Sequence, residues 1–351
     1  MWERIPARRH RPVSHSAASP LEHPFAQYVR ILGKGPNLSR PLSLDEARTA
    51  MGMVMRGEVE QAQLGAFLCL LRVKTELPEE AAGLALGIKD HLNVPAGLPA
   101  VDVDWASYAG KSRQLPYYVP AALCLAQHGV KVFMHGAEGH TGGRVYTSQV
   151  LAALGVPVAT DFAQAAAHLN DHAFAYMRLE HLSPALHQIM GLRQLLGLRS
   201  PIHTVARMVN PLNAAFSING VTHPPYLPVH QEGSRLMGEK AMAAFKGDGG
   251  EVERRPEKSC EVFFLQDGQP GTEDWPALVS GVREKEESLD LARLKALWRG
   301  EGNDEMAVAA IAGTMAIVLR YCGRAKSVAE AEGAALAMWR DRIKGALPGA
   351  A

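Results

Sequence analysis

The sequence predicts an α/β fold in which a small all-α N-terminal domain precedes a larger α/β domain with a mainly parallel central sheet. Residues 25–93 have helical periodicity throughout, whereas short apolar segments alternate with helical ones after Pro95. One of these segments, 130–134, leads through a glycine-rich turn into a helical stretch. With 351 residues, of which 47% are apolar and 21% charged, the chain is long enough to bury two cores.

The first domain, expected over 25–95, contains helices that begin with recognisable signals. Ser43 and Glu46 form a capping box, and Pro78 with two glutamates is typical of a first helical turn. A basic arm, 1–24, precedes the domain and has few apolar residues to bury, so we expect it to be flexible. A solvated tail explains this arm as well as a binding role does. The predicted helices are 25–32, 44–56, 60–73 and 78–92.

The second domain, 96–351, alternates strands and helices with short connections, which favours right-handed crossovers. An antiparallel pair is expected near its end, at 252–255 and 261–265. The parallel strands are predicted at 101–105, 130–134, 156–159 and 173–177. Their helices are predicted at 120–128, 148–154, 162–170 and 184–196, and three more at 289–298, 306–322 and 328–343.

Composition narrows the class of protein. The four cysteines lie far apart without a Cys-x-x-Cys pair, which argues for reduced, buried thiols and against a zinc site. No apolar run is long enough to cross a bilayer, and the N-terminus has no secretion signal, so we expect a cytoplasmic protein without a membrane partner. The net charge of +1 neither indicates nor excludes a nucleic-acid partner.

The turn at 139–144 is a candidate phosphate site, because small residues between a strand and a helix let backbone N–H groups approach an anion. A tight turn that needs its glycines only for positive φ is the alternative. The candidate residues are His140, Thr141, Gly142, Gly143 and Arg144.

Short motifs follow one another in a fixed order along the chain: 56–59 (Arg-Gly-Glu-Val), 63–68, 135–136 (His-Gly), 140–143, 199–204 (Arg-Ser-Pro-Ile-His-Thr) and 210–212. In this order they resemble the anthranilate phosphoribosyltransferase and pyrimidine nucleoside phosphorylase superfamily over 25–339. Within it, the chain is most similar to the anthranilate phosphoribosyltransferase-like branch, some members of which bind DNA or RNA without sequence preference. The resemblance implies a phosphorylase/phosphoribosyltransferase-like fold and a homodimer formed through the helical domain, with Phe67, Leu68, Leu70 and Leu71 as interface candidates.

The family's pyrophosphate loop, Gly-Thr-Gly-Gly-Asp, corresponds to 107–113, where only Gly110 is retained and Lys111 replaces the acid. A phosphate there would depend on the charges of Lys111 and Arg113 rather than on the backbone. The family's Lys-His-Gly-Asn-Arg segment keeps His135 and Gly136 as candidate anion ligands, although a structural histidine is the more frequent explanation for His135.

The resemblance also implies a magnesium site with two adjacent carboxylates. The corresponding segment, 247–253, keeps Glu251 but has Val252 in the second position. Asp248 is the candidate replacement, so Glu251 and Asp248 are the metal candidates. Mg²⁺ is expected only if the protein is enzymatically active, and no other cofactor is expected.

Two of the three segments that carry the family's chemistry are altered in this chain. We therefore expect a protein that has kept the family's fold but binds nucleic acid through a basic groove. Basic loop residues are predicted to gather at the carboxyl edge of the sheet and to contact the phosphates of single-stranded DNA or RNA. Tyr108, Tyr117 and Tyr118 are candidates for stacking on bases. Pairing of the arginines with acids on a solvated face is the alternative. The predicted residues are Lys111, Arg113, Arg144, Arg178, Arg193, Arg199, His203 and Arg207.

The competing function is an active pentosyltransferase, of phosphoribosyltransferase or nucleoside phosphorylase type. It would bind a phosphorylated small molecule, with Ser200 beside the histidines of the anion site and Glu251 on magnesium. The retained His-Thr-Gly-Gly turn favours this alternative.

Overall fold

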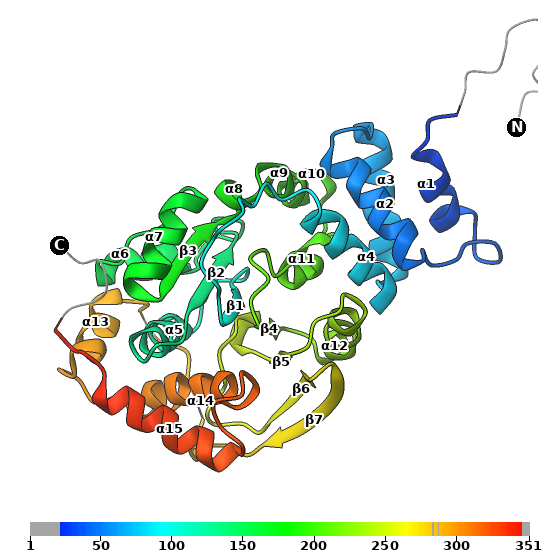
Figure 1. The fold of residues 1–351 in the computed structure, drawn as a ribbon. Helices are drawn as coiled ribbons and strands as arrows, with labels where there is room; N and C mark the ends of the chain where they lie inside the picture. Colours follow the sequence, from blue (N-terminus) through cyan, green and yellow to red (C-terminus); the bar gives the residue numbers. More distant parts are fainter. Residues whose placement is uncertain (1–21, 283, 287, 346–351) are drawn as a thin grey trace, which may run out of the picture.

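The computed structural model describes residues 22–282, 284–286 and 288–345. It confirms the predicted architecture, a helical N-terminal unit beside a larger α/β domain with a mostly parallel sheet (Figure 1). The expected basic arm lies outside the described residues except for its last three. None of the described helices is long and apolar enough to span a membrane.

The helical unit consists of α1 (Ala26–Gly33), α2 (Leu44–Met55), α3 (Gln61–Lys74) and α4 (Pro78–Lys89). The predicted capping box begins α2, where the backbone N–H of Glu46 donates to the Ser43 hydroxyl over 3.2 Å. In return, the N–H of Ser43 donates to the Glu46 carboxylate over 2.9 Å. Phe67, Leu68 and Leu71 are buried, so they form the core of this unit rather than a free surface.

Within the described residues the sheet has seven strands in the order β3-β2-β1-β4-β5-β6-β7. The first five are parallel, and the last two pair antiparallel at one edge. The parallel strands are β1 (Val103–Ala106), β2 (Val132–Gly136), β3 (Phe174–Arg178), β4 (Phe216–Val221) and β5 (Met242–Lys246). The edge pair is β6 (Cys260–Gln266) and β7 (Gln269–Trp275).

The sequence prediction misplaced part of this sheet. β4 and β5 are fully or mostly buried central strands that were not predicted, because Ser217, Asn219 and Gly220 interrupt the apolar pattern of β4. The predicted strand at 156–159 forms only one bridge, between Ala159 and Met177. The predicted strand at 252–255 is a loop, and the antiparallel pair is β6 with β7 instead.

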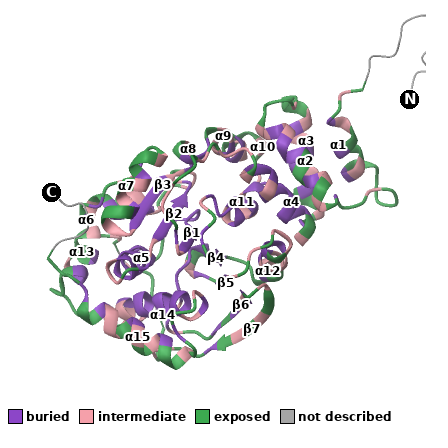
Figure 2. Ribbon diagram, viewed as in Figure 1, coloured by how far each residue is buried: buried purple, intermediate pink, exposed green. Residues whose placement is uncertain are grey.

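Helices cover both faces of the sheet, and the strands between them are buried (Figure 2). One face packs in a large core with α5 (Tyr118–Gln127), α6 (Thr147–Leu154), α13 (Leu291–Arg299), α14 (Glu305–Tyr321) and α15 (Val328–Asp341). The other face packs with the helical unit, α7 (Phe162–His172), α8 (Leu179–Leu182), α9 (Pro184–Gly191) and α11 (Ile202–Val205). Next to it, α12 (Leu227–Leu236) covers β5 and β6.

The helical unit and the sheet share one continuous core rather than two separate ones. Phe67 of α3 and Phe133 of β2 belong to the same apolar cluster, together with Ile202 of α11. The predicted helix at 184–196 is divided at Leu192 into α9 and α10 (Arg193–Leu196). These short helices after β3 therefore connect the carboxyl edge of the sheet to the helical unit (Figure 1).

Candidate anion-binding site

The loops that follow β1, β2, β4 and β5 leave the sheet at its carboxyl edge, where ligands bind in open α/β folds. Most of the residues singled out in the sequence lie in these loops or in α10, α11 and the residues that follow them. The structure divides them into two groups with opposite electrostatic environments.

The loop after β1 binds a carboxylate of the protein itself. The backbone N–H groups of Ala109 and Gly110 donate to one oxygen of Glu251 over 2.6 and 2.5 Å. The Arg144 guanidinium donates to the carbonyls of the same two loop residues over 2.8 and 3.1 Å. Glu251 is fully buried, and this burial raises the pKa of its carboxyl. These two backbone donors are therefore occupied by Glu251.

Lys111, in the same loop, is buried in an internal ion-pair network. Its side chain is 2% exposed and its ammonium contacts Glu253 over 2.7 Å and also Asp248. Arg113 lies on the exposed part of the loop, where its carbonyl accepts a hydrogen bond from Glu286 N–H. The charge of Lys111 is thus offset within the protein and does not reach solvent.

The two metal candidates are held by protein groups. Glu251 accepts the two loop N–H groups, and Asp248 pairs with Lys111. Across the described ranges, no group of three His, Cys, Asp or Glu side chains is placed to hold a metal ion. As arranged here, these residues do not fit a magnesium site with two free carboxylates.

His135 and Gly136, at the end of β2, hold neighbouring loops together. The fully buried His135 ring contacts the Tyr108 hydroxyl through Nδ1 over 2.8 Å and Asp104 through Nε2 over 3.3 Å. A side chain on Gly136 would place its Cβ 1.7 Å from the carbonyl oxygen of Ser107. Gly136 is therefore required for the close contact between the β1 and β2 loops, which matches the structural interpretation of this pair.

The glycine turn after β2 is partly exposed, and two of its residues, His140 and Thr141, contact an arginine. The Arg193 guanidinium donates to the Thr141 hydroxyl over 3.2 Å and to the carbonyl of His140 over 3.4 Å. Gly142 and Gly143 are exposed beside them. The turn thus lies next to a cation, where an anion would be attracted.

The N-terminus of α6, which follows this turn, is occupied by an acid. The backbone N–H of Ser148 donates to Glu138 over 2.8 Å, and Glu138 also accepts from the Tyr176 hydroxyl over 2.6 Å. A carboxylate at a helix N-terminus offsets the helix dipole. The Glu138 carboxylate therefore occupies the position at the start of α6 where an external anion could otherwise bind.

Four arginines form the second group, which we call the arginine cluster: Arg144, Arg193, Arg199 and Arg207. Among the residues that the structure describes, none of the four forms an ion pair with a carboxylate. The pKa of His140 is lowered to about 4, mainly by burial and then by the charges of all four arginines. Burial and the other three arginines lower the pKa of Arg199. The four charges therefore repel one another at close range.

A small pocket beside the arginine cluster, which we call the basic pocket, has a volume of about 120 Å³. Three arginines line it, Arg72 of α3 together with Arg199 and Arg207. Hydroxyl groups of Ser200 and Thr222 also line it, at the start of the α11 segment and at the end of β4. The pocket thus joins the helical unit to the carboxyl edge of the sheet.

Histidines complete the basic pocket, and two of them have buried nitrogen atoms without a partner. Within the described part of the chain, Nε2 of His203, Nδ1 of His230 and Nη1 of Arg207 accept or donate no hydrogen bond. Burial, followed by nearby arginines, lowers the pKa of His203 to about 4 and that of His230 to about 3. Both rings are therefore neutral at pH 7. Buried polar atoms usually have partners, so this concentration indicates a place for a ligand.

The structure thus brings together five predicted residues, Arg144, Arg193, Arg199, His203 and Arg207, with Ser200 and the His140 turn alongside. Arg178 lies apart from them, paired with Glu180 over 3.2 Å and near Glu138. Sequence reasoning missed six polar residues of the pocket lining: Arg72, Thr204, Thr222, His223, Tyr226 and His230. Thr204 lies in the motif at 199–204, and Thr222 and His223 lie in a Val-Thr-His-Pro run after β4.

The three tyrosines considered for base stacking are buried, so they do not present their rings to a base. Tyr108 instead supports the arginine cluster, because its ring lies 5.6 Å from the guanidinium carbon of Arg207. Tyr117 and Tyr118 belong to the core on the opposite face of the sheet.

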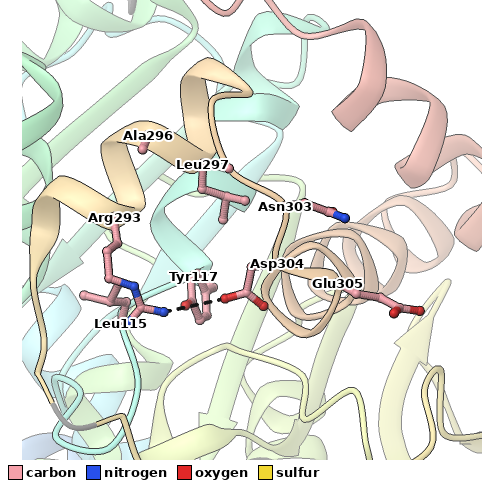
Figure 3. Close-up of a pocket in the computed structure, with 9 residues that line it drawn as sticks. Leu115, Tyr117, Arg293, Ala296, Leu297, Asn303, Asp304 and Glu305 are labelled. Atoms are coloured by element: carbon pink, nitrogen blue, oxygen red, sulfur yellow. Dashed lines mark ion pairs between the residues drawn. The ribbon is translucent and has the colours of Figure 1, made fainter.

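A larger cavity of about 460 Å³ lies between α13 and the start of α14 (Figure 3). Arg293 and Asp304 face each other across it in an ion pair of 3.8 Å. Its lining combines these charges with Leu115, Tyr117 and Leu297, and it contains none of the predicted anion-binding residues. The concentration of unpaired charge is therefore in the basic pocket and not in this larger cavity.

Comparisons with known proteins identify the family models that this chain matches. Residues 26–92 match the helical bundle domain of the glycosyl transferase family. Residues 119–341 match the α/β domain of the same family. The two matches cover most of the helical unit and of the α/β domain.

Individual relatives and structures agree with the family models. The uncharacterized protein YbiB of Escherichia coli is 28% identical over 247 residues, which cover 69% of this chain and 76% of YbiB. An anthranilate phosphoribosyltransferase of Oleidesulfovibrio alaskensis is 29% identical over 274 residues, or 74% of this chain and 80% of that enzyme.

Two crystal structures have the same fold. The anthranilate phosphoribosyltransferase of Thermus thermophilus superposes with a TM-score of 0.76 at 20% identity, covering 91% of this chain and 94% of the enzyme. The enzyme of Saccharomyces cerevisiae, in complex with PRPP and Mg, superposes with a TM-score of 0.72 at 16% identity, covering 90% and 96% of the respective chains.

Proposed function

The chain belongs to the glycosyl transferase family as an anthranilate phosphoribosyltransferase-like member, and from that premise we propose that it binds nucleic acid through the phosphate backbone. The arginine cluster and the basic pocket are the proposed binding surface. Single-stranded DNA or RNA is the proposed partner. Recognition through the phosphates, which every nucleotide carries, is independent of base sequence.

The observation that supports this proposal best is that none of the four clustered arginines forms an ion pair with a carboxylate of the described residues, and that only Arg207 has a carboxylate, Glu251, among the charges that shift its pKa. Elsewhere at the same edge, Lys111 and Arg178 each pair with acids of the protein. Uncompensated like charges at close range cost free energy in the folded state. A bound polyanion would offset that cost, which is the physical reason to assign the cluster to a ligand.

The spread of the arginine cluster favours the backbone of a nucleic acid, with its many phosphates, over a single phosphate group. Its arginines come from the β2 loop, from α10 and from both sides of α11, so they are distributed over several elements. A nucleic-acid strand carries a charge at every nucleotide and can contact several of these elements at once.

Binding of a 20-nucleotide single strand, followed by fluorescence anisotropy over a series of NaCl concentrations, tests the proposal. We expect the logarithm of the association constant to fall linearly with the logarithm of the salt concentration, by about 0.7 for each phosphate contact. Absence of binding at low salt, or an affinity that does not change with salt, would show the proposal to be wrong.

Pentosyl transfer is the second candidate, and the yeast relative bound to PRPP and Mg favours it. In this chain the β1 loop is occupied by Glu251, and Asp248 pairs with Lys111. We therefore rank transfer below binding. Incubation with anthranilate, phosphoribosyl pyrophosphate and magnesium, and separately with nucleosides and phosphate, tests it. Formation of product in either reaction would reverse this ranking.

A homodimer formed through the helical unit is part of the proposal. Exposed apolar side chains of this unit include Leu38, Val73 and Leu77, which offer contact area that Phe67 and Leu68 in the core do not. Light scattering of the purified protein measures the assembly directly, and a monomeric mass would contradict the dimer.

A further inference from the structure

We infer that the basic pocket is a receptor for a phosphomonoester, which is either the terminal phosphate of a nucleic-acid strand or a free mononucleotide. The strand-end form of this inference rests on the proposed nucleic-acid binding and refines it. The mononucleotide form stands without it.

The size of the basic pocket favours a single phosphate group. Its volume of about 120 Å³ is small, and the helical unit, the α11 segment and the end of β4 enclose it on different sides. An internal phosphodiester has two ester links, both of which must leave such a pocket. A phosphomonoester has one ester link and three free oxygens that accept hydrogen bonds.

The charge of the basic pocket fits a phosphate group with one or two negative charges. Arg72, Arg199 and Arg207 contribute three positive charges. The carboxylates that act on them, Glu76 on Arg72 and Glu251 on Arg207, are not among the residues that line the pocket. Arg72 is held in place by a hydrogen bond from its guanidinium to the Tyr226 hydroxyl over 3.1 Å. A phosphomonoester carries between 1.5 and 2 negative charges at pH 7, whereas a diester carries one.

The histidines add a requirement that only a monoester meets. Nδ1 of His203 lies 3.2 Å from the Ser200 carbonyl, which accepts only a hydrogen bond, so Nδ1 carries the proton and donates. In the neutral ring, Nε2 of His203 is then an acceptor with no donor in the described residues. The proton of a phosphomonoester, whose second pKa is about 6, can be donated to Nε2. An ionised phosphodiester has no such proton.

His230 points to the same conclusion from α12. Its side chain is 1% exposed, and its Nδ1 has no hydrogen-bond partner within the described residues. Arg207 contributes the unpartnered Nη1 beside it in the same pocket. A phosphate oxygen or hydroxyl placed in the pocket would satisfy these two buried atoms.

The test uses a 12-nucleotide single strand in matched pairs, with a 5′-phosphate or a 5′-hydroxyl and with a 3′-phosphate or a 3′-hydroxyl, each labelled at the opposite end. We expect at least one phosphorylated end to bind about tenfold more tightly, which is about 1.4 kcal/mol. The preference should strengthen from pH 8 to pH 6, as the monoester gains its proton. Equal affinities for both pairs would exclude the strand-end form.

Two variants test whether a preference for phosphorylated strand ends arises in the basic pocket. Thr222→Val removes an exposed hydroxyl from its lining, and His230→Ala removes a buried ring. We expect the ratio of the two affinities to fall toward one in both variants, whatever happens to the affinities themselves. Glu232→Gln, on the exposed side of α12, is the matched control and should keep the ratio. A ratio unchanged in Thr222→Val and His230→Ala would overturn the assignment.

A separate arm distinguishes the source of the phosphate. Binding of AMP and of inorganic phosphate is followed by the ³¹P NMR signal in wild type and in Thr222→Val. Binding that the variant weakens, without preference for a strand end, identifies a free mononucleotide as the ligand. No binding of AMP or phosphate, together with equal affinities for all strand ends, would refute the inference. Failure of hydroxyl-ended strands to bind at low salt bears on the proposed function alone.

Discussion

The β1 loop and the arginine cluster lie at the same edge of the sheet but differ in how their charges are compensated. In the β1 loop, Lys111 is buried between Asp248 and Glu253, and the loop N–H groups bind Glu251. In the arginine cluster, positive charges face one another and form no ion pair within the described residues, and only Arg207 is offset in part, by Glu251. The first arrangement stabilises the fold, and the second leaves a charge for an external anion to offset.

This contrast distinguishes basic residues that look alike in the sequence. Lys111 and Arg199 are both cations in predicted ligand loops, yet only Arg199 is exposed. Substitutions in the two regions are therefore expected to affect different properties. Stability should change in the β1 loop, and binding should change in the arginine cluster.

The largest effect is expected for Lys111→Met. This substitution removes the cation that pairs with the buried Glu253 and the partly buried Asp248, so we expect the free energy of unfolding to fall by about 3–5 kcal/mol. Urea unfolding measures the change. Lys246→Met, at an exposed position at the end of β5, is the control and should alter stability by at most about 0.5 kcal/mol. Equal effects of the two substitutions would contradict the buried network.

Gly136→Ala is expected to be the next most damaging. Its Cβ would overlap the Ser107 carbonyl, so the β1 and β2 loops must move apart, at a cost of about 1–3 kcal/mol. Gly142→Ala, in the exposed turn beside the cluster, meets no atom within 4 Å and should be nearly neutral. Thermal unfolding of the pair measures the difference. A destabilised Gly142→Ala with an unaffected Gly136→Ala would invert the expected pattern.

Arg199→Gln should lower affinity without lowering stability. Removal of one charge relieves repulsion within the cluster, so the melting temperature should stay the same or rise. Affinity for single-stranded DNA should fall about fivefold in 0.1 M salt, the effect of losing one phosphate contact. Arg178→Gln, which removes a cation paired with Glu180, is the comparison and should weaken binding less. The idea fails if Arg178→Gln weakens binding more than Arg199→Gln.

Acidification should lower stability through two half-buried histidines, His140 and His203. Burial and arginines hold the pKa of His140 and His203 at about 4, below the ordinary value of 6.5. The unfolded chain therefore binds more protons between about pH 6.5 and pH 4, and stability is lost as the pH falls through this range. Melting temperatures from pH 8 to pH 5 should decline less in His140→Gln/His203→Gln than in wild type. Parallel declines would show that these rings do not contribute.

The overall architecture could be predicted from the sequence because the spacing of apolar residues along a helix or strand is a local property. The helical unit, the parallel sheet and the final helices were all predicted from it. β4 was missed because buried Ser217 and Asn219 break its apolar pattern. Their burial depends on neighbouring strands, which a local pattern does not contain.

The site was only partly predictable for a related reason. Arg199, His203 and Arg207 are spaced by four residues, and they line one pocket. Lys111 was grouped with them because its partners are distant in sequence, Glu253 being 142 residues away. His230 and Arg72 reach the pocket from α12 and α3, and nothing in their local sequence marks them.

The salt dependence of single-strand binding by wild type and by Arg193→Gln/Arg199→Gln tests the central claim, that the unpaired arginines bind phosphates. We expect the slope of the logarithm of affinity against the logarithm of salt concentration to become shallower by about 1.4 in the double variant, or about 0.7 for each lost contact. An identical slope in the two proteins would contradict the claim.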